Sequence, residues 1–257
     1  MTDFVIAIPS CNRPGICRTH TLKLLEDHKI NPETVFVFVA DNEAAKAYEY
    51  SLKPGSYNEI VVGVPGLVEQ REFITSYWPP GQKIVSLDDD ITGFDLSLSD
   101  TFKEDSLETF ITKAFSTCEK AGAHIWGVYP CWNAKFRQKN TEITQYLRYL
   151  VGAFYGFINE PNEEELKITV CREGNKEDVE RSIKYFIRDG QTVRFNRVGF
   201  QTKYYNSEGG LGTFKARLAP MKKASYNLLD SYSQYGRVYV RKSGMTEFKL
   251  HKLFCKA

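Results

Sequence analysis

Three consecutive aspartates, Asp88 to Asp90, are the residues of this 257-residue chain best suited to chemistry. They follow the apolar run Ile84 to Leu87, which has the composition of a buried strand. Adjacent carboxylates repel one another, and a bound divalent cation offsets this repulsion most simply. Asp oxygens and substrate phosphates are usual ligands of Mg²⁺ or Mn²⁺. The run therefore predicts a metal site that holds a diphosphate. The alternative is an acidic helix start with Asp90 as the N-cap.

A second acidic pair, Glu177-Asp178, begins a segment with helical periodicity that continues to Arg188. Carboxylates in a first helical turn lie near the positive end of the helix dipole and stay ionised. Asp178 in such a position can take the proton from an incoming hydroxyl group. Acidic residues are common at helix starts, so the pair also fits a purely structural role.

The elements that must position these residues alternate between strand and helix. Such alternation predicts an α/β fold with a Rossmann-like, mostly parallel sheet flanked by helices, whose ligands lie beyond the carboxyl ends of the strands. Asp41 ends the second expected strand, and the aspartate run ends the fourth. The expected strands are 4–9, 35–40, 60–64, 84–87, 124–129 and 151–158, and the expected helices are 17–28, 43–52, 67–77, 107–121 and 177–188.

Charge is distributed unevenly along the chain. Residues 1–180 carry 18 Lys/Arg and 28 Asp/Glu, a charge of −10. Residues 181–257 carry 16 Lys/Arg and 4 Asp/Glu, a charge of +12, and the two parts sum to the net charge of +2. A basic C-terminal third joined to an acidic half predicts a polyanionic partner, nucleic acid first among them. A solvated basic surface is the alternative.

Several protein classes are disfavoured by composition. No apolar run approaches the roughly 20 residues of a membrane span, and the N-terminus lacks the basic flank and long apolar stretch of a secretory signal. The six cysteines show neither a CxxC pair nor a zinc-like spacing, so we expect free thiols. We therefore expect a cytoplasmic protein with no membrane partner, and nothing implies an obligate protein partner.

The order of these segments resembles that of inverting glycosyltransferases with the GT-A fold, which begin with a strand and a loop like residues 8–14, Ile-Pro-Ser-Cys-Asn-Arg-Pro. The resemblance implies that this loop lies against the nucleotide, that an Asp after the second strand contacts the base, and that a Gly-x-x-x-x-Arg segment (GLVEQR here) helps hold the sugar nucleotide. Cys11 departs from the family's usual Tyr. The implied residues for binding the sugar nucleotide are Pro9, Ser10, Asn12, Arg13, Asp41, Gly66, Arg71, Asp88 and Asp89.

The same resemblance assigns the chemistry. It implies a UDP-sugar donor with Mn²⁺ or Mg²⁺, Asp90 as metal ligand and Asp88 as a contact of the sugar nucleotide. Asp178, in a Glu-Asp motif with Glu177, becomes the catalytic base. The family's C-terminal pair of metal-binding histidines is not clear here, which leaves His251 as the candidate.

Three later segments, EDVERSIKYF, VRFNRVGF and YYNSEGGLGTFKARL, resemble the phage TET-associated glycosyltransferases, which add sugars to 5-hydroxymethylpyrimidines in DNA. Together the resemblances imply a GT-A catalytic domain at 1–190 and, packed on its acceptor side within one continuous domain, a basic segment at 191–257. The acceptor-binding candidates are Trp132, Arg194, Tyr204, Gly209, Gly210 and Arg217.

The sequence thus predicts inverting transfer of a hexose, glucose from UDP-glucose, to the hydroxyl of 5-hydroxymethylpyrimidine in DNA, in the cytoplasm of a host cell if the chain is phage-encoded. For aromatic residues such as Phe195 and Phe200 the alternatives are stacking on an extruded base and a place in the core, which is the commoner one; for Trp126 they are a wall of the acceptor site and a place in the core. The alternatives are a glycan, lipid or protein acceptor, a catalytically inactive nucleic-acid-binding module, and a nucleotidyltransferase, which would need a basic triphosphate loop. Sugar, nucleotide, acceptor, anomeric outcome and oligomeric state stay open.

Overall fold

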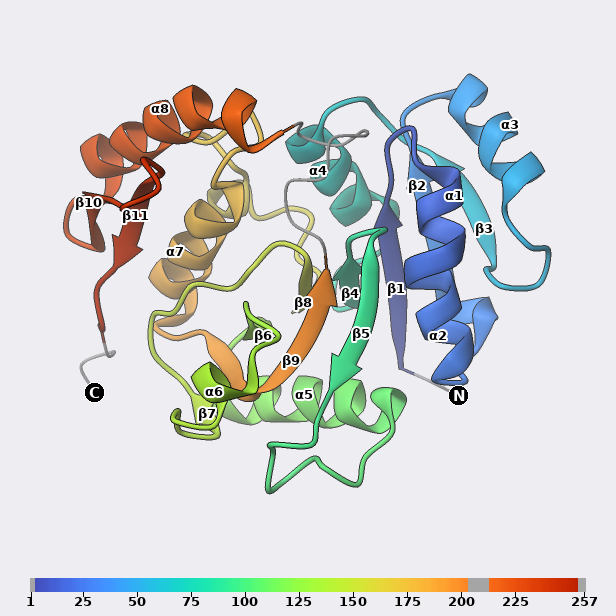
Figure 1. Cartoon of the computed structure of the whole chain (residues 1–257), viewed down its shortest axis with the longest axis horizontal. Coiled ribbons are helices and arrows are strands. Elements are labelled where there is room, and N and C mark those ends of the chain that lie inside the picture. Colours follow the sequence, from blue (N-terminus) through green and yellow to red (C-terminus); the bar gives the residue numbers. More distant parts are fainter. Residues whose placement is uncertain (1–2, 203–212, 254–257) are drawn as a thin grey trace.

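A central nine-stranded sheet organises the chain in a computed structural model that describes residues 3–202 and 213–253 (Figure 1). The strand order is β3-β2-β1-β4-β8-β6-β9-β5, with β7 paired to β9, and a separate hairpin joins β10 to β11. The strands are β1 (Phe4–Pro9), β2 (Val35–Val39), β3 (Glu59–Val62), β4 (Lys83–Leu87), β5 (Ile91–Asp95), β6 (Ile125–Tyr129), β7 (Ile143–Thr144), β8 (Phe154–Ile158), β9 (Val193–Thr202), β10 (Gly236–Val240) and β11 (Thr246–Leu250).

Helical segments connect the strands and cover the sheet. The helix at Leu107–Ala121 begins and ends at residues suited to capping: Ser106 accepts a hydrogen bond from the backbone N–H of Thr109, and Gly122 ends the helix in the left-handed region. The segments are α1 (Pro14–Cys17), η1 (Arg18–Leu22), α2 (Lys23–Asp27), η2 (Pro32–Thr34), α3 (Asn42–Ser51), α4 (Leu67–Tyr77), α5 (Leu107–Ala121), α6 (Ala134–Arg137), η3 (Glu164–Leu166), α7 (Glu177–Asp189) and α8 (Phe214–Tyr232).

The predicted α/β class and its mostly parallel sheet are confirmed. Strands β3, β2, β1 and β4 are parallel neighbours, as the alternation of strand and helix required. Strand β8 is antiparallel to β4 and β6, and β5 and β7 are antiparallel to β9, so six of the nine described strands point the same way. The parallel group carries its loops to one edge, where the aspartate run follows β4.

Two hydrophobic layers hold this sheet between its helices. Ile6 and Ile8 of β1 pack in one layer with side chains of α2 and α5, whereas Ala7, between them in the strand, packs in the other layer with Ile74 of α4. This division follows from the alternation of side chains along a strand. Both faces of the strand that precedes the 8–14 loop are therefore buried.

The central sheet continues past residue 190, where the sequence placed the start of the basic segment. Strand β9 lies inside the central sheet between β6 and β5, because its apolar residues complete the core there. The part packed outside the sheet consists of α8 and the β10-β11 hairpin, which lie beside α7 (Figure 1). Ile183 of α7, Leu228 of α8 and Phe248 of β11 share a third hydrophobic cluster.

Three aromatic residues for which the sequence left both an acceptor-side and a core position open lie in the core. Phe195 and Trp126 are fully buried, and Phe200 is 2% exposed, so none of them can stack on a base. They are strand residues on inward-facing positions, which sequence composition alone does not distinguish from a binding surface. Among the described helices, none is long and apolar enough to cross a membrane.

Candidate active site

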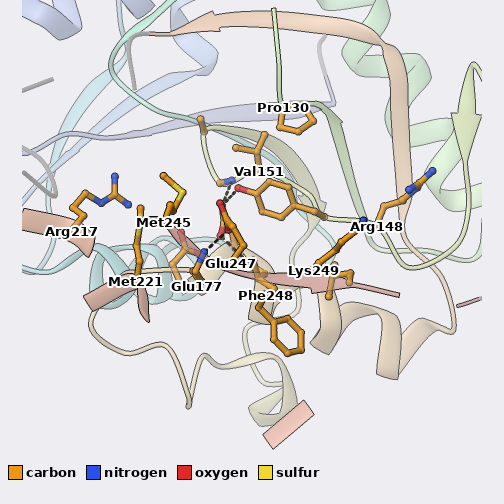
Figure 2. A pocket seen from close by; sticks show the side chains of 18 of the residues that line it. Pro130, Arg148, Val151, Glu177, Arg217, Met221, Met245, Glu247, Phe248 and Lys249 are labelled. Atoms are coloured by element: carbon orange, nitrogen blue, oxygen red, sulfur yellow. Dashed lines mark hydrogen bonds and ion pairs between the residues drawn. The ribbon is translucent and has the colours of Figure 1, made fainter. Parts of the chain in front are cut away.

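A cleft of about 670 Å³ lies between the end of β4, the start of α7 and the β10-β11 hairpin (Figure 2). It brings together residues far apart in the chain, because α7 and the hairpin pack side by side next to the sheet edge. Of the residues selected from the sequence, the following line it: Arg71, Asp88, Glu177, Asp178, Arg194, Arg217 and His251.

Arg71 connects the aspartate run to the Glu177-Asp178 pair. Its guanidinium forms ion pairs with Glu177 and, at 3.1 Å, with Asp88, and it donates a hydrogen bond of 2.7 Å to the carbonyl of Gly152. Arg181, one turn along α7, forms a second ion pair with Glu177. Burial opposes the charge on Arg71, but Glu177 and Asp88 outweigh it and raise its pKa. The network fixes α4, β4 and α7 relative to one another.

Glu177 has a different role from Asp178 in this network. It is 3% exposed, and its two carboxylate oxygens face Arg71 and Arg181. Burial raises the pKa of Glu177 against the opposing effects of Arg181 and Arg71. Because both oxygens are engaged by arginines, its geometry favours positioning of Arg71 over proton transfer. Its assignment as a catalytic residue stays a prediction.

Asp178 faces the cleft and keeps polar contacts that orient its carboxylate. Its Oδ2 atom accepts hydrogen bonds from the Tyr149 hydroxyl at 2.6 Å and from the backbone N–H of Gly152 at 3.2 Å, while Oδ1 accepts one from the N–H of Val179 at 2.9 Å. Lys176, the residue before α7, has φ +62°, and no side chain caps the helix. Asp178 is therefore held in the first turn of α7, at the positive end of the helix dipole.

Gly152 allows these contacts by lacking a side chain. A Cβ atom at this position would lie 2.6 Å from Arg71 Nη1 and 3.0 Å from Glu177 Oε1. The glycine thus lets its own backbone approach both the Arg71 network and Asp178. No motif in the sequence marked it.

Asp89 is fully buried. It accepts hydrogen bonds from the Ser10 hydroxyl and from Nε and Nη2 of Arg13. Ser10 also contacts the Tyr48 hydroxyl of α3. Asp89 therefore anchors the 8–14 loop to the aspartate run, and its assignment as a contact of the sugar nucleotide stays a prediction.

Asp90, the expected metal ligand, has a side chain that is 19% exposed and lies outside the cleft lining, whereas Asp88 lines the cleft with a side chain that is 34% exposed. Asp90 Oδ1 accepts a hydrogen bond from Thr202 at 2.6 Å, and Oδ2 lies 3.4 Å from Arg13 Nη1. No group of three or more His, Cys, Asp or Glu within the described ranges is arranged to hold a metal. One carboxylate fits a Mg²⁺ or Mn²⁺ that takes its other ligands from substrate phosphates and water.

Burial gives the run unusual electrostatics. It raises the pKa of Asp88 to about 7 against the opposing effect of Arg71, and it raises that of Asp89 to about 6 against Arg13. The neighbouring carboxylates add to both shifts. A cation beside the run would favour its ionised form, as the sequence argument expected.

The remaining candidates for binding the sugar nucleotide lie outside the cleft lining. Asp41 is exposed and caps α3 by accepting a hydrogen bond of 2.8 Å from the N–H of Ala44. Asn12 has φ +56°, and Gly66 has φ +100° at the start of α4, where a Cβ would clash with Glu69. Pro9 ends β1 beside them in the chain. Their contacts with a nucleotide stay predictions.

The acceptor-side candidates divide into three groups. Arg194 and Arg217 line the cleft, whereas Trp132 is 41% exposed and lies outside the lining, next to Arg137. Tyr204, Gly209 and Gly210 fall outside the described residues. His251 is exposed at the cleft, and the structure assigns no metal partner to it.

Two cations of the cleft, Arg148 and Arg194, have no carboxylate within 4.0 Å among the described residues. Arg194 is 6% exposed, and burial together with Arg148 lowers its pKa to about 10. It stays charged at neutral pH. Sequence reasoning missed Arg148, Tyr149 and Gly152, because they belong to an irregular stretch between β7 and β8 whose only local signal is a mixture of aromatic and basic residues.

The similarity of this chain to known proteins lies in its three-dimensional structure. No protein-family model matches the chain. No curated protein matches its sequence. Glucosyl-3-phosphoglycerate synthase from Mycobacterium tuberculosis, solved with Mg²⁺ and UDP, matches with a TM-score of 0.52 and 11% identity over 98% of this chain and 88% of that chain.

The fold is of the GT-A type. The same enzyme solved with phosphoglyceric acid matches with a TM-score of 0.51 and 12% identity over 92% of this chain and 84% of that chain. The crystal structure of a mycobacterial protein matches with a TM-score of 0.52 and 12% identity over 98% of this chain and 84% of that chain. At such identities the likeness is one of fold, and the activity must be argued from the site.

Proposed function

We propose that this protein is a metal-dependent, inverting glycosyltransferase that uses a UDP-sugar, with glucose as the expected sugar. The observation that carries the proposal is the cleft in which Arg71 joins Asp88, at the end of β4, to the start of α7, where Asp178 faces the same space. A sugar nucleotide beyond the carboxyl ends of the parallel strands would place its sugar between these groups.

Asp178 is the proposed general base. It takes the proton of the acceptor hydroxyl, whose oxygen then forms a bond to the anomeric carbon as the bond to the UDP oxygen breaks and UDP leaves. Tyr149 and the N–H of Gly152 orient the carboxylate during this step. Single displacement inverts the anomeric centre.

Asp90 is the proposed protein ligand of Mg²⁺ or Mn²⁺, together with the diphosphate. When bound, the cation supplies charge neutralisation at the departing diphosphate. Arg13 lies against Asp89 and Asp90 and would hold the 8–14 loop beside the nucleotide. Asp88 and Arg71 would face the sugar.

For the acceptor we propose 5-hydroxymethylpyrimidine in DNA. Arg217 of α8, Arg241 after β10 and Lys249 of β11 line the cleft and belong to the basic C-terminal third. Such cations neutralise backbone phosphates, and binding through them weakens steeply with salt. A small phosphorylated acceptor is the second candidate, favoured by the enclosed Arg148 and Arg194 and by the phosphoglyceric acid bound in one structure of similar fold.

Nucleotide release with defined donors and acceptors tests the proposal. The protein is incubated with Mn²⁺, UDP- and GDP-sugars, and either hydroxymethylated or plain duplex DNA, and both released nucleotide and DNA mass are measured. We expect UDP release with a gain of one hexose per modified base on hydroxymethylated DNA alone. Nucleotide release without a change in DNA mass would exclude DNA and leave the small-acceptor candidate.

The variant Asp90→Asn separates an enzyme from an inactive binding module. We expect it to lose the dependence of UDP release on Mn²⁺ along with most of the activity. Asp100→Asn is the matched control, because Asp100 is an exposed aspartate that pairs with Arg197 away from the cleft lining. Equal activity of wild type and Asp90→Asn would exclude this metal site.

A further inference from the structure

We propose that Arg148 and Arg194 form a subsite for a phosphate group of the acceptor, a proposal that rests on the transferase function and names its substrate class. The two guanidinium groups line the same cleft as Asp178. They lie close enough for the positive charge of Arg148 to act on Arg194. We call them the arginine pair.

Arg194 is oriented by the protein but not neutralised by it. Its Nε atom donates to Asn196 Oδ1 at 2.8 Å, its Nη1 atom donates to the Tyr149 carbonyl at 3.2 Å, and its guanidinium lies 5.2 Å from the centre of the Tyr129 ring. These hydrogen bonds are to neutral oxygens. They leave Nη2 without a hydrogen bond to any residue that the structure describes.

Arg148 has still fewer contacts. Its guanidinium lies 4.7 Å from the centre of the Tyr146 ring, and its Nε atom is buried without a hydrogen-bond partner in the described chain. In Figure 2 the side chain of Arg148 lies at the right of the cleft and that of Arg217 at the left. A buried donor without a partner is costly and marks a place where a ligand oxygen can bind.

The half-buried Arg148 and the buried Arg194 differ from Arg71, Arg137 and Arg181, which also have a buried nitrogen without a partner, in having no carboxylate partner among the described residues. Arg71 and Arg181 share Glu177, and the fully buried Arg137 is paired with Asp95. Two adjacent cations without a carboxylate repel each other in a medium of low dielectric constant. Retaining them at a cleft is explained most simply by an anion that binds there.

Phosphate fits the arginine pair better than a carboxylate does. A guanidinium presents parallel N–H donors that match phosphate oxygens, and phosphate offers enough oxygens for two arginines at once. The pair also lies beside Tyr149, whose carbonyl holds Arg194 and whose hydroxyl holds Asp178. A phosphate bound there would hold the rest of the acceptor near the base.

Binding of inorganic phosphate tests the subsite without any transfer reaction. Calorimetric titrations are made at constant ionic strength with saturating Mg²⁺ and UDP, so that the expected diphosphate site is filled. We expect Arg148→Gln to weaken phosphate binding about tenfold or more, the loss of at least one charge-assisted hydrogen bond. Arg148→Lys should retain part of the affinity, and Lys242→Gln, an exposed cation outside the cleft lining, should retain all of it.

Thermal unfolding without phosphate distinguishes a ligand site from a structural role. Removing one of two mutually repelling cations should leave Arg148→Gln at least as stable as wild type. A clear loss of stability, or a phosphate affinity equal to that of wild type, would overturn the subsite. Phosphate binding needs no turnover, so a protein that binds phosphate through Arg148 but never releases UDP refutes only the transferase proposal.

A parallel titration with a hydroxymethylcytosine-containing oligonucleotide identifies the source of the phosphate. If the group is a DNA phosphodiester, Arg148→Gln weakens binding of both the oligonucleotide and inorganic phosphate. If it is the phosphate of a small acceptor, the variant weakens binding of phosphate and leaves that of the oligonucleotide unchanged. Either pattern supports the subsite.

Discussion

Two sets of charges, the aspartate run that reaches the cleft through Asp88 and the arginine pair that lines it, are partnered in opposite ways. Each carboxylate of the aspartate run has an arginine partner, Arg71 or Arg13, that comes from the first half of the chain. The arginine pair, Arg148 and Arg194, has no carboxylate partner among the described residues. We infer that the proposed donor end, at the aspartate run, is held by ion pairs within the protein. The proposed acceptor end, at the arginine pair, leaves its positive charges to pair with an anionic ligand.

The sharpest test of this comparison is the base that lies between the two sets. Asp178→Asn keeps the shape of the side chain and removes its ability to accept a proton. We expect kcat for sugar transfer to fall by about 10²–10⁴, the usual contribution of general base catalysis. Steady-state UDP release measures it, with Glu173→Gln, an exposed residue before α7, as the control. An unchanged kcat would remove Asp178 from the mechanism.

The internal pairing at the donor end predicts a large effect on stability. Arg71→Met leaves Glu177 and Asp88 without their shared partner, and breaking a buried pair in this way costs about 3–5 kcal/mol. Urea unfolding monitored by circular dichroism measures the loss. Lys23→Met, which breaks an exposed pair with Asp27, should leave the midpoint nearly unchanged. Similar midpoints for both variants would contradict a rigid donor end.

A smaller effect on stability is expected at Gly152, whose backbone lies against the ion pair of Arg71 and Glu177. Gly152→Ala places a methyl group against Arg71 and Glu177, and overpacking of this kind costs about 1–3 kcal/mol. The shift of the backbone should also lower kcat, because the Gly152 N–H orients Asp178. Gly15→Ala, at a helical position of α1 where a Cβ meets nothing within 4 Å, controls for the loss of a glycine. Full activity in Gly152→Ala would show that this contact is dispensable.

The smallest effect concerns the 8–14 loop, which touches Asp89 but lies outside the cleft lining. Cys11 in this loop is exposed, whereas Cys17 is buried, and burial raises the pKa of the Cys17 thiol. Saturating UDP-glucose and Mg²⁺ should slow alkylation of Cys11 severalfold if the nucleotide covers the loop. Peptide mapping by mass spectrometry follows the reaction, with Cys131 as the internal control. Equal rates of Cys11 alkylation with and without UDP-glucose would show that the nucleotide does not cover this loop.

Much of the fold could be predicted from local patterns. The helices at 67–77 and 107–121 have the expected bounds, and the other predicted elements lie within three residues of theirs. Apolar runs, capping residues such as Asp41 and Ser106, and the order of segments are local signals, so they survive in a single sequence. Beyond residue 190 the mixture of aromatic, basic and glycine residues gave no such signal, and α8 and the hairpin were not predicted.

The sequence by itself determined that three carboxylates follow a buried strand, that Glu177 and Asp178 begin a helix, and that the basic charge lies late in the chain. Only the tertiary structure decided which of them face the cleft. Successive residues point in different directions, and their partners lie 76 residues away for Asp89 and Arg13 and 106 away for Arg71 and Glu177. Contacts across such distances depend on how strands and helices pack. For this reason only the tertiary structure shows that Asp89 holds the 8–14 loop and that Arg148 and Arg194 line the same cleft.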